Sequence, residues 1–475
     1  MDYSYFLLMQ QEVSLVVVFL ALLCYDIFAS DKSRKHFQAV ACTLFFIHTL
    51  FGIIYPVNYG TAFGGMFINT PISILMKNIL NIGTMIVLLQ TNNWLKRPDT
   101  VVRRGEFFTL TLSTLLGMYF MISAGNLLML YVGMELASLP LAAMVALNKY
   151  RHESAEAGAK YVMLASLSSA VALFGISFIY GATGSFYFDT IAAKLTEVTP
   201  FVITGFIFFF SGLAFKLSLV PFHLWTADVY EGAPTSVTGY LSVISKGAAT
   251  FTLLFVLYKA FGSVKIVWEP VLWWLAIITI TLGNLFAIRQ KNIKRFFAFS
   301  SISQAGYILL GVLSGTAQGM ASTIYFVLVY VFSNLAAFAV ISSIENQTGK
   351  VTIPDYNGLY KTNPRLSFLM MLAVFSLAGI PPFAGFFSKF FIFAAAAEQG
   401  HFLLVFIALL NTVISLFYYL LIIKAMFIKQ SDTPIEAISS DGYNKASMLI
   451  CLLGILVIGF ISLIYDRMDM LSFGM

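Results

Sequence analysis

Long apolar runs alternate with short polar stretches along almost the whole chain. A helix that crosses the hydrocarbon core of a bilayer needs about 20 mostly apolar residues. Fourteen runs, of 17 to 30 residues, are about this long or longer. They occupy residues 13–29, 39–59, 72–90, 106–123, 125–148, 160–182, 200–221, 236–260, 267–288, 300–316, 321–344, 367–396, 402–428 and 446–465. Glycine, proline or lysine interrupts the second, third, seventh and twelfth runs. The pattern predicts an all-α polytopic membrane protein with about 14 transmembrane helices.

The basic residues between the runs are distributed unevenly. Loops after odd-numbered runs hold 19 Lys and Arg residues, whereas loops after even-numbered runs and the C-terminal tail hold 4. Cytoplasmic loops of membrane proteins carry an excess of Lys and Arg. This split predicts that both termini lie on the periplasmic side. It also supports the count of fourteen, because one missed helix would scramble the alternation.

The five remaining basic residues are lysines inside the runs. An ionisable group within the bilayer is costly and usually functional, although a lysine near a helix end can extend to the headgroups. We expect Lys77 and Lys424 to reach the surface in this way, because they lie within about one to two turns of the run ends. Lys246 lies near the middle of its run. Lys216 and Lys389 each lie beside a proline.

Proline breaks two of the runs next to these lysines. Pro221 follows Lys216 by five residues, and Pro381 and Pro382 shortly precede Lys389. In a bilayer a broken helix is tolerated only where protein or a water-filled cavity satisfies the freed backbone groups. Two broken helices in corresponding positions are typical of transporters built from inverted repeats. The alternative is that these are ordinary kinks, which are frequent in membrane helices.

The broken runs are the seventh and the twelfth. An odd offset of five runs places the second repeat upside down relative to the first. The predicted organisation is therefore two inverted five-helix repeats, formed by runs 4–8 and 9–13. In residues, it comprises an N-terminal three-helix segment (1–105), a first repeat (106–260), a second repeat (261–428) and a C-terminal loop with the last helix (429–475).

One acidic residue, Glu135, lies deep in a run, while Asp26 lies near a run end beside basic residues, where a surface pair is expected. Neighbouring opposite charges stabilise each other's charged form. A Glu135–Lys216 pair would therefore hold a proton that separation of the pair releases. The alternative is a purely structural ion pair. A buried lysine can release its proton whereas arginine retains it, so the mid-run lysines favour proton traffic over anion binding.

These residues suggest a relay. We predict that Glu135, Lys216, Lys246 and Lys389 form a water-linked polar path along the middle of the membrane. His223, just after the first break, either joins the relay or ties down the broken helix.

Composition excludes other classes of protein. The chain is 59% hydrophobic and 11% charged, with a mean hydropathy of +0.86. Soluble domains are about 45–50% apolar and about 25% charged. A soluble enzyme, a disordered protein and a nucleic-acid binder are excluded, and the net charge of +6 forms no basic face. The three cysteines form no CxxC pair, and no glycine-rich nucleotide motif follows a strand. We expect no cofactor and no metal in this chain.

Five stretches carry a family resemblance. They read YVGMELASLPLAAMVAL (131–147), EAGAKYVMLASLSSAVALFG (156–175), GLAFKLSLVPFHLWTADVYEGAPTSVTGYLSVISKGAA (212–249), NIKRFFAFSSISQAGYILLG (292–311) and AGIPPFAGFFSKF (378–390). In this order they resemble the antiporter-like membrane subunits of respiratory complex I, most closely subunit N of the bacterial NADH–quinone oxidoreductase. The resemblance extends over nearly the whole chain.

The resemblance implies a function and an assembly. It assigns proton pumping to Glu135, Lys216, Lys246 and Lys389, with Lys160 modulating the first pair. It implies that NADH oxidation and quinone reduction occur elsewhere in the complex, so that NADH, FMN, iron–sulfur clusters and quinone belong to other subunits. It also implies subunits M and K as neighbours, the bacterial inner membrane as the location, and no nucleic acid.

Three other functions stay open at this point. A subunit of a multi-subunit cation/proton antiporter would share the fold. A standalone permease would need a substrate pocket at the broken helices. A purely structural scaffold would tolerate replacement of Lys216 or Lys389 without loss of proton flux.

Overall fold

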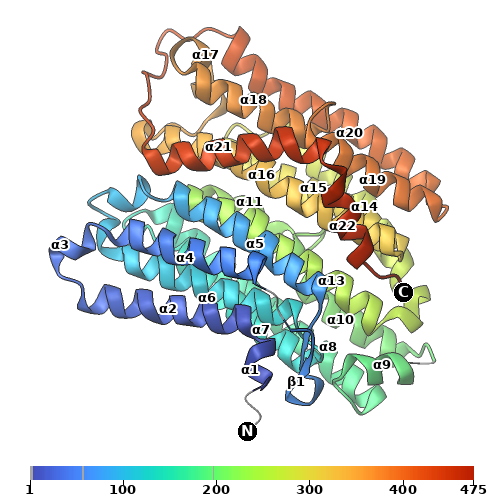
Figure 1. Ribbon diagram of the computed structural model, residues 1–475. Coiled ribbons are helices and arrows are strands. Elements are labelled where there is room, and N and C mark those ends of the chain that lie inside the picture. The colour runs from blue at the N-terminus through green and yellow to red at the C-terminus, as the bar shows by residue number, and fades with distance from the viewer. Residues whose placement is uncertain (1–3, 56–57, 196) are drawn as a thin grey trace. The chain divides into compact units, whose positions relative to one another are not determined.

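The computed structural model describes residues 4–55, 58–195 and 197–475 (Figure 1). Within these ranges, 13 helices are long and apolar enough to cross a membrane. The predicted all-α polytopic fold is therefore confirmed. The chain divides into two compact units: residues 1–88, 95–216 and 247–267 form unit 1, and residues 89–94, 217–246 and 268–475 form unit 2.

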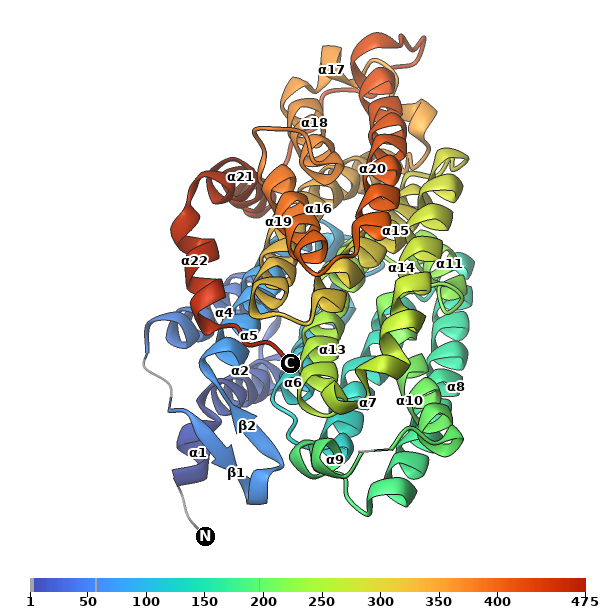
Figure 2. The same ribbon diagram turned by 90° about the vertical axis from the view of Figure 1, so that its right-hand side faces the viewer.

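Unit 1 holds the helices of the N-terminal part. They are α1 (Ser4–Leu8), α2 (Gln10–Phe28), α3 (Asp31–Arg34), α4 (Phe37–Ile54), α5 (Pro71–Gln90, to Leu88), α6 (Arg104–Ile122), α7 (Leu127–Val145), α8 (His152–Thr183), α9 (Phe188–Lys194), α10 (Pro200–Leu217, to Lys216) and most of α13 (Lys246–Lys259). A small antiparallel hairpin, β1 (Gly60–Ala62) and β2 (Phe67–Asn69), lies beside α1 (Figure 2). These strands were not predicted from the sequence, and the second predicted helix, 39–59, ends at Ile54 instead.

Unit 2 holds the later helices. They are α11 (Leu224–Gly232), α12 (Thr235–Tyr240), most of α14 (Lys265–Ile288), α15 (Ile293–Ser314), α16 (Ala317–Thr348), α17 (Leu359–Thr362), α18 (Pro364–Ala378), α19 (Ala384–Glu398), α20 (Phe402–Ile423), α21 (Gly442–Val457) and α22 (Ser462–Leu471). The twelfth predicted helix, 367–396, is two short helices, α18 and α19, because the chain turns at 379–383. The last, 446–465, is likewise divided between α21 and α22.

Asparagine and threonine side chains set the start of several spans. Asn126 accepts a hydrogen bond from the Met129 amide at the start of α7, and Asn292 accepts from two amides at the start of α15. Both asparagines also form an isolated strand bridge, to Tyr187 and Thr352 respectively. The helices that follow, α8 and α16, are each 32 residues long. These matched elements lie five spans apart in the chain, the offset expected for the two repeats, whose boundaries stay a prediction.

Close glycine contacts join α6 to α7. A Cβ atom added at Gly117 would lie 2.4 Å from the Ala137 amide nitrogen, and one added at Gly133 would lie 2.8 Å from the Met121 amide nitrogen. Each glycine therefore faces the backbone of the other helix. Such small-residue contacts let membrane helices approach closely.

We predict that Gly117→Ala destabilises unit 1. The added methyl group meets backbone atoms that cannot rotate away, and overpacking of this kind costs about 1–3 kcal/mol. Gly442→Ala is the matched control, because a Cβ atom there meets nothing within 4 Å. Thermal unfolding in detergent should show a lower midpoint for Gly117→Ala alone. Equal midpoints for the two variants would contradict this packing.

Candidate functional site

The first predicted pair lies in unit 1, on α7 and α10. Lys216 is in the last turn of α10, is 6% exposed, and donates a hydrogen bond to Ser138 Oγ at 2.5 Å. Ser138 lies one helical turn after Glu135 on α7. The charge of Glu135 acts on Lys216 and on Tyr161, and the Glu135 Oε1 atom is buried without a hydrogen-bond partner among the described residues. Lys216 therefore lies near Glu135 but is held by a neutral hydroxyl.

The first helix break follows directly in the chain. α10 ends at Leu217, and α11 begins at Leu224 after a turn that contains Pro221. Within unit 2, the Val220 amide donates to Thr279 Oγ1 of α14 at 3.1 Å. A neighbouring helix thus satisfies a backbone group that the break releases, as the membrane interior requires.

Lys246 lies at a distortion in its span. The backbone forms a π-helical turn over Leu241–Ser245, and Lys246 follows it at the start of α13. Such π-bulges often mark functional sites. The lysine is 3% exposed, donates to Ser301 Oγ at 2.8 Å, and lies 5.7 Å from the centre of the Tyr230 ring. His223 lies close enough to Lys246 for the two side chains to interact electrostatically.

At the second break, Lys389 holds the two short helices together. It is the sixth residue of α19, yet its Nζ atom donates at 3.0 Å to the carbonyl of Ala378, the last residue of α18. A cation at a helix C-terminus also interacts favourably with the helix dipole. The Gly385 amide donates to Ser376 Oγ at 3.1 Å. Both prolines of this turn, Pro381 and Pro382, are exposed.

A cavity of about 10 Å³ adjoins Lys389 in unit 2. Its polar lining consists of Gln304, Tyr330, Ser333, Ser376, Ser388 and Lys389. A space of roughly 10–15 Å³ accommodates one water molecule. The buried Tyr330 hydroxyl lies close to Ser301, the acceptor of Lys246. Ser301, Tyr330 and this cavity thus lie between Lys246 and Lys389. These residues could not be singled out from the sequence, because a serine or tyrosine in a membrane helix carries no signal of its own.

Two secondary candidates are more peripheral. Lys160 lies within α8, eight residues after its first residue, and not at the start of the span as its apolar run indicated. It pairs with Glu156 at 2.7 Å, and its side chain is 42% exposed. His223 is partly buried, and its Nδ1 atom has no hydrogen-bond partner among the described residues.

The expectation that Lys77 snorkels to the surface was wrong. Lys77 is 0% exposed and forms an ion pair with Glu12 at 2.6 Å. Glu12 is 2% exposed and is thus an acid inside the bundle that could not be placed there from the sequence, because its partner is on another helix. Lys424, by contrast, is exposed at the end of α20, as expected.

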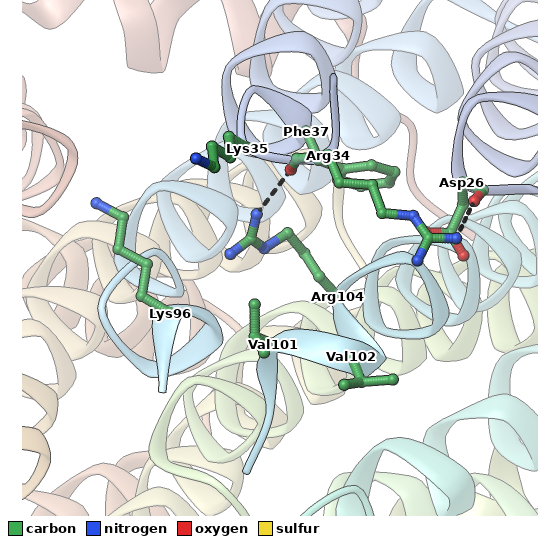
Figure 3. A pocket seen from close by; sticks show the side chains of 8 residues that line it. All are labelled: Asp26, Arg34, Lys35, Phe37, Lys96, Val101, Val102 and Arg104. Atoms are coloured by element: carbon green, nitrogen blue, oxygen red, sulfur yellow. Dashed lines mark hydrogen bonds between the residues drawn. The ribbon is translucent and has the colours of Figure 1, made fainter. Parts of the chain in front are cut away.

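A cavity of about 570 Å³ in unit 1 is lined by four cationic side chains, one acid and three apolar residues (Figure 3). The cationic residues are Arg34, Lys35, Lys96 and Arg104. Arg34 donates to the backbone carbonyl of Asp26 at 3.2 Å. None of the predicted relay residues lines this cavity. Among the described residues, no three His, Cys, Asp or Glu side chains are grouped so as to hold a metal ion.

The fold and the buried lysines define a class: a polytopic membrane protein with ionisable groups inside its spans. Residues 124–415 match the family model described as "NADH:quinone oxidoreductase/Mrp antiporter, TM". A protein of Azobacteroides pseudotrichonymphae genomovar. CFP2 named NADH-quinone oxidoreductase subunit N is 60% identical over 477 residues, which cover 100% of this chain and 99% of that protein. The subunit N of Phocaeicola vulgatus is 55% identical over 99% of each chain.

Solved structures agree. A chain of the respiratory complex I from Thermus thermophilus with bound Aureothin superimposes with a TM-score of 0.81 at 29% identity, covering 96% of this chain and 98% of that one. A chain of the Mrp complex from Dietzia sp. DQ12-45-1b shares the fold, with a TM-score of 0.83 at 19% identity over 97% of this chain and 96% of that one. The chain therefore belongs to the NADH:quinone oxidoreductase/Mrp antiporter transmembrane family.

Gly379 provides a test of the second break. It ends α18 with a φ of +86°, and a Cβ atom there would lie 3.0 Å from Lys389 Cδ. Gly349, which ends α16 with a φ of +70°, has nothing within 4 Å of such an atom. We expect both glycine-to-alanine variants to lose about 1–2 kcal/mol from the left-handed backbone. Gly379→Ala should lose more, because it also displaces Lys389. Equal losses in chemical unfolding of the two variants would contradict this contact.

Proposed function

We propose that this chain is the N-type membrane subunit of an NADH–quinone oxidoreductase and that it moves protons through Glu135 and Lys216 in unit 1 and through Lys246 and Lys389 in unit 2. The observation that supports the proposed relay is that these three lysines form hydrogen bonds to uncharged partners. Each is almost fully buried and donates to an uncharged oxygen, which belongs to Ser138, Ser301 or Ala378. A lysine held by a neutral acceptor can lose its proton without stranding a partner carboxylate.

The free energy available from pKa changes of buried groups matches the free energy needed to move a proton across the membrane. Moving one elementary charge across the membrane involves about 2.3 kcal/mol per 100 mV. A change of one unit in the pKa of a buried group corresponds to about 1.4 kcal/mol. Changes of a few units, driven by the opening and closing of the Glu135–Lys216 contact, are therefore sufficient to drive a proton outward through Lys246 and Lys389. In this proposal Lys160 modulates the pair, and His223 either joins the relay or steadies the first break.

The chain would act as one subunit of a multi-subunit complex. Redox chemistry would occur in other subunits, which would carry NADH, FMN, the iron–sulfur clusters and quinone. Subunits M and K are the proposed neighbours in the membrane. The location is the bacterial inner membrane, with both termini on the periplasmic side, as the distribution of basic residues favours.

The second candidate is a subunit of a multi-subunit cation/proton antiporter, which the shared fold of the Mrp chain favours. Affinity purification of the tagged chain from native membranes in mild detergent separates the two. An N-type subunit should co-purify with NADH–quinone reductase activity and with flavin and iron–sulfur absorbance. An antiporter subunit should co-purify with hydrophobic proteins alone. A standalone permease would need a substrate pocket at the broken helices, and at the second break the cavity beside Lys389 has room for one water molecule only.

Replacing a relay lysine should abolish pumping. In the assembled complex, we expect Lys389→Met to stop proton transport while NADH oxidation continues, because methionine keeps the volume but carries no proton. Lys424→Met is the control, because Lys424 is exposed at the end of α20. Proton uptake into inverted membrane vesicles and NADH oxidation are measured together. Full pumping by Lys389→Met would favour the scaffold alternative.

The Tyr330 hydroxyl should also contribute to proton transport. Tyr330→Phe removes the hydroxyl beside the one-water cavity and leaves the ring, so we expect slower proton transport with normal assembly. Tyr356→Phe is the matched control: its hydroxyl is likewise buried and without a hydrogen-bond partner among the described residues, but it lies outside the spans, in the turn Ile353–Tyr356. If both variants pump at the same rate, Tyr330 has no part in the path.

A further inference from the structure

A second group of buried ionisable side chains lies in unit 1, outside the predicted relay and outside the part of the chain that matches the family model. It occupies the interior between α2, α4, α5 and α6, which run side by side in Figure 1. Its core is the ion pair between Lys77 Nζ and Glu12 Oε1 at 2.6 Å. Lys77 also donates to Asn69 Oδ1 at 3.5 Å, and its Nζ atom lies 5.2 Å from the centre of the Phe67 ring and 5.7 Å from that of Tyr119.

A hydrogen-bonded chain continues from the other side of Tyr119. Its hydroxyl donates to Asn81 Oδ1 and lies 3.1 Å from His48 Nε2. His48 Nδ1 is 2.7 Å from Ser14 Oγ. Glu12 and Ser14 come from α2, and Lys77 and Asn81 lie one turn apart on α5. His48, Tyr119 and Asn81 are 2%, 0% and 0% exposed.

These hydrogen bonds can accommodate His48 in either protonation state. Because the Tyr119 hydroxyl donates to Asn81, Nε2 of His48 is the donor to Tyr119. In the neutral ring, the Ser14 hydroxyl donates to Nδ1. In the protonated ring, Nδ1 donates to Ser14 Oγ, and the Ser14 hydroxyl turns to the Gln11 carbonyl, which lies 3.1 Å away. The bond that forms is Nδ1–H, and one hydroxyl rotation accommodates it.

Packing alone gives little reason for such a group. A buried ion pair is often no more stabilising than apolar side chains of the same volume. In a membrane, ionisable residues inside the bundle typically mark proton or ion pathways. The group adjoins the hairpin: Asn69 belongs to β2, whose partner strand β1 exposes Gly60 and Thr61.

We propose that Glu12, Lys77 and His48 form a second proton-binding site of this chain, which exchanges protons with the aqueous phase next to the β1–β2 hairpin. In its resting form the Lys77 ammonium faces the Glu12 carboxylate. The site takes up a proton at His48 Nδ1 or at Glu12, and it loses one from Lys77. The inference rests on the proposed function, because the proton movement it serves is that of the assembled oxidoreductase.

The test uses the assembled complex reconstituted in lipid vesicles, with protons moved per NADH oxidised as the readout. Lys77→Arg keeps a cation opposite Glu12 but holds its proton at all relevant pH values. We expect this variant to assemble with normal flavin and iron–sulfur absorbance and to lose part of the proton-to-NADH ratio. Lys96→Arg is the control, because Lys96 is exposed in the same unit. An unchanged ratio in Lys77→Arg would overturn the proposal.

A second variant, His48→Gln, tests the proposal if the arginine of Lys77→Arg does not fit in the protein interior. Glutamine retains hydrogen bonding but cannot take up the proton, so the pH profile of pumping should change while assembly stays normal. An unchanged profile, or failure of both variants to assemble, would assign the group a structural role and overturn the proposal. Lys216→Met is measured in parallel. If it pumps normally, the proposed function itself fails; if it alone loses pumping, only the second site fails.

Discussion

The absence of water from the bilayer core is the constraint on which the rest of this structure depends. A broken transmembrane helix frees backbone groups that lipid cannot satisfy, and a buried charge has no solvent to stabilise it. In this chain the same contact can satisfy both a freed backbone group and a buried lysine. Lys389 crosses the second break to donate to the Ala378 carbonyl, so the helix end holds the lysine and the lysine closes the helix end. At the first break, Thr279 accepts from the Val220 amide. The breaks are thus stable features, and each places a lysine where its partner is polar but uncharged.

Two kinds of buried lysine follow from this constraint. Lys216, Lys246 and Lys389 donate to hydroxyl or carbonyl oxygens, whereas Lys77 faces a carboxylate. A lysine facing a carboxylate leaves that charge without a counter-ion when it gives up its proton, whereas a lysine facing a neutral oxygen leaves no charged partner behind. The first three are therefore suited to passing a proton on, and the fourth to holding one until Glu12 is neutralised. The Glu135 carboxylate, close to Lys216 but not bonded to it, lies between these two arrangements.

The sequence was sufficient for the spans, because hydropathy reports the bilayer directly, and for the two breaks, because proline cannot continue a regular helix. It was also sufficient to single out the mid-span lysines. It failed where the answer depends on neighbours distant in the chain. Lys77 was expected at the surface from its depth alone, but Glu12, 65 positions earlier, pairs with it inside the bundle. Tyr330 gave no signal, because the cavity that it lines is formed by α15, α16, α18 and α19 together. The hairpin at residues 60–69 lies between the second and third apolar runs, and each of its strands is only three residues long, too short to show an alternating pattern.

The central claim is that the buried lysines carry protons and do not merely hold helices together. The most direct measurement is the number of protons moved per NADH oxidised by the assembled complex with Lys246→Arg. Arginine retains the positive charge and can still donate to Ser301, but it does not release its proton. The account predicts an intact complex that oxidises NADH and no longer pumps through this chain. An unchanged proton-to-NADH ratio would contradict it, since a fixed charge would then serve as well as an exchangeable proton.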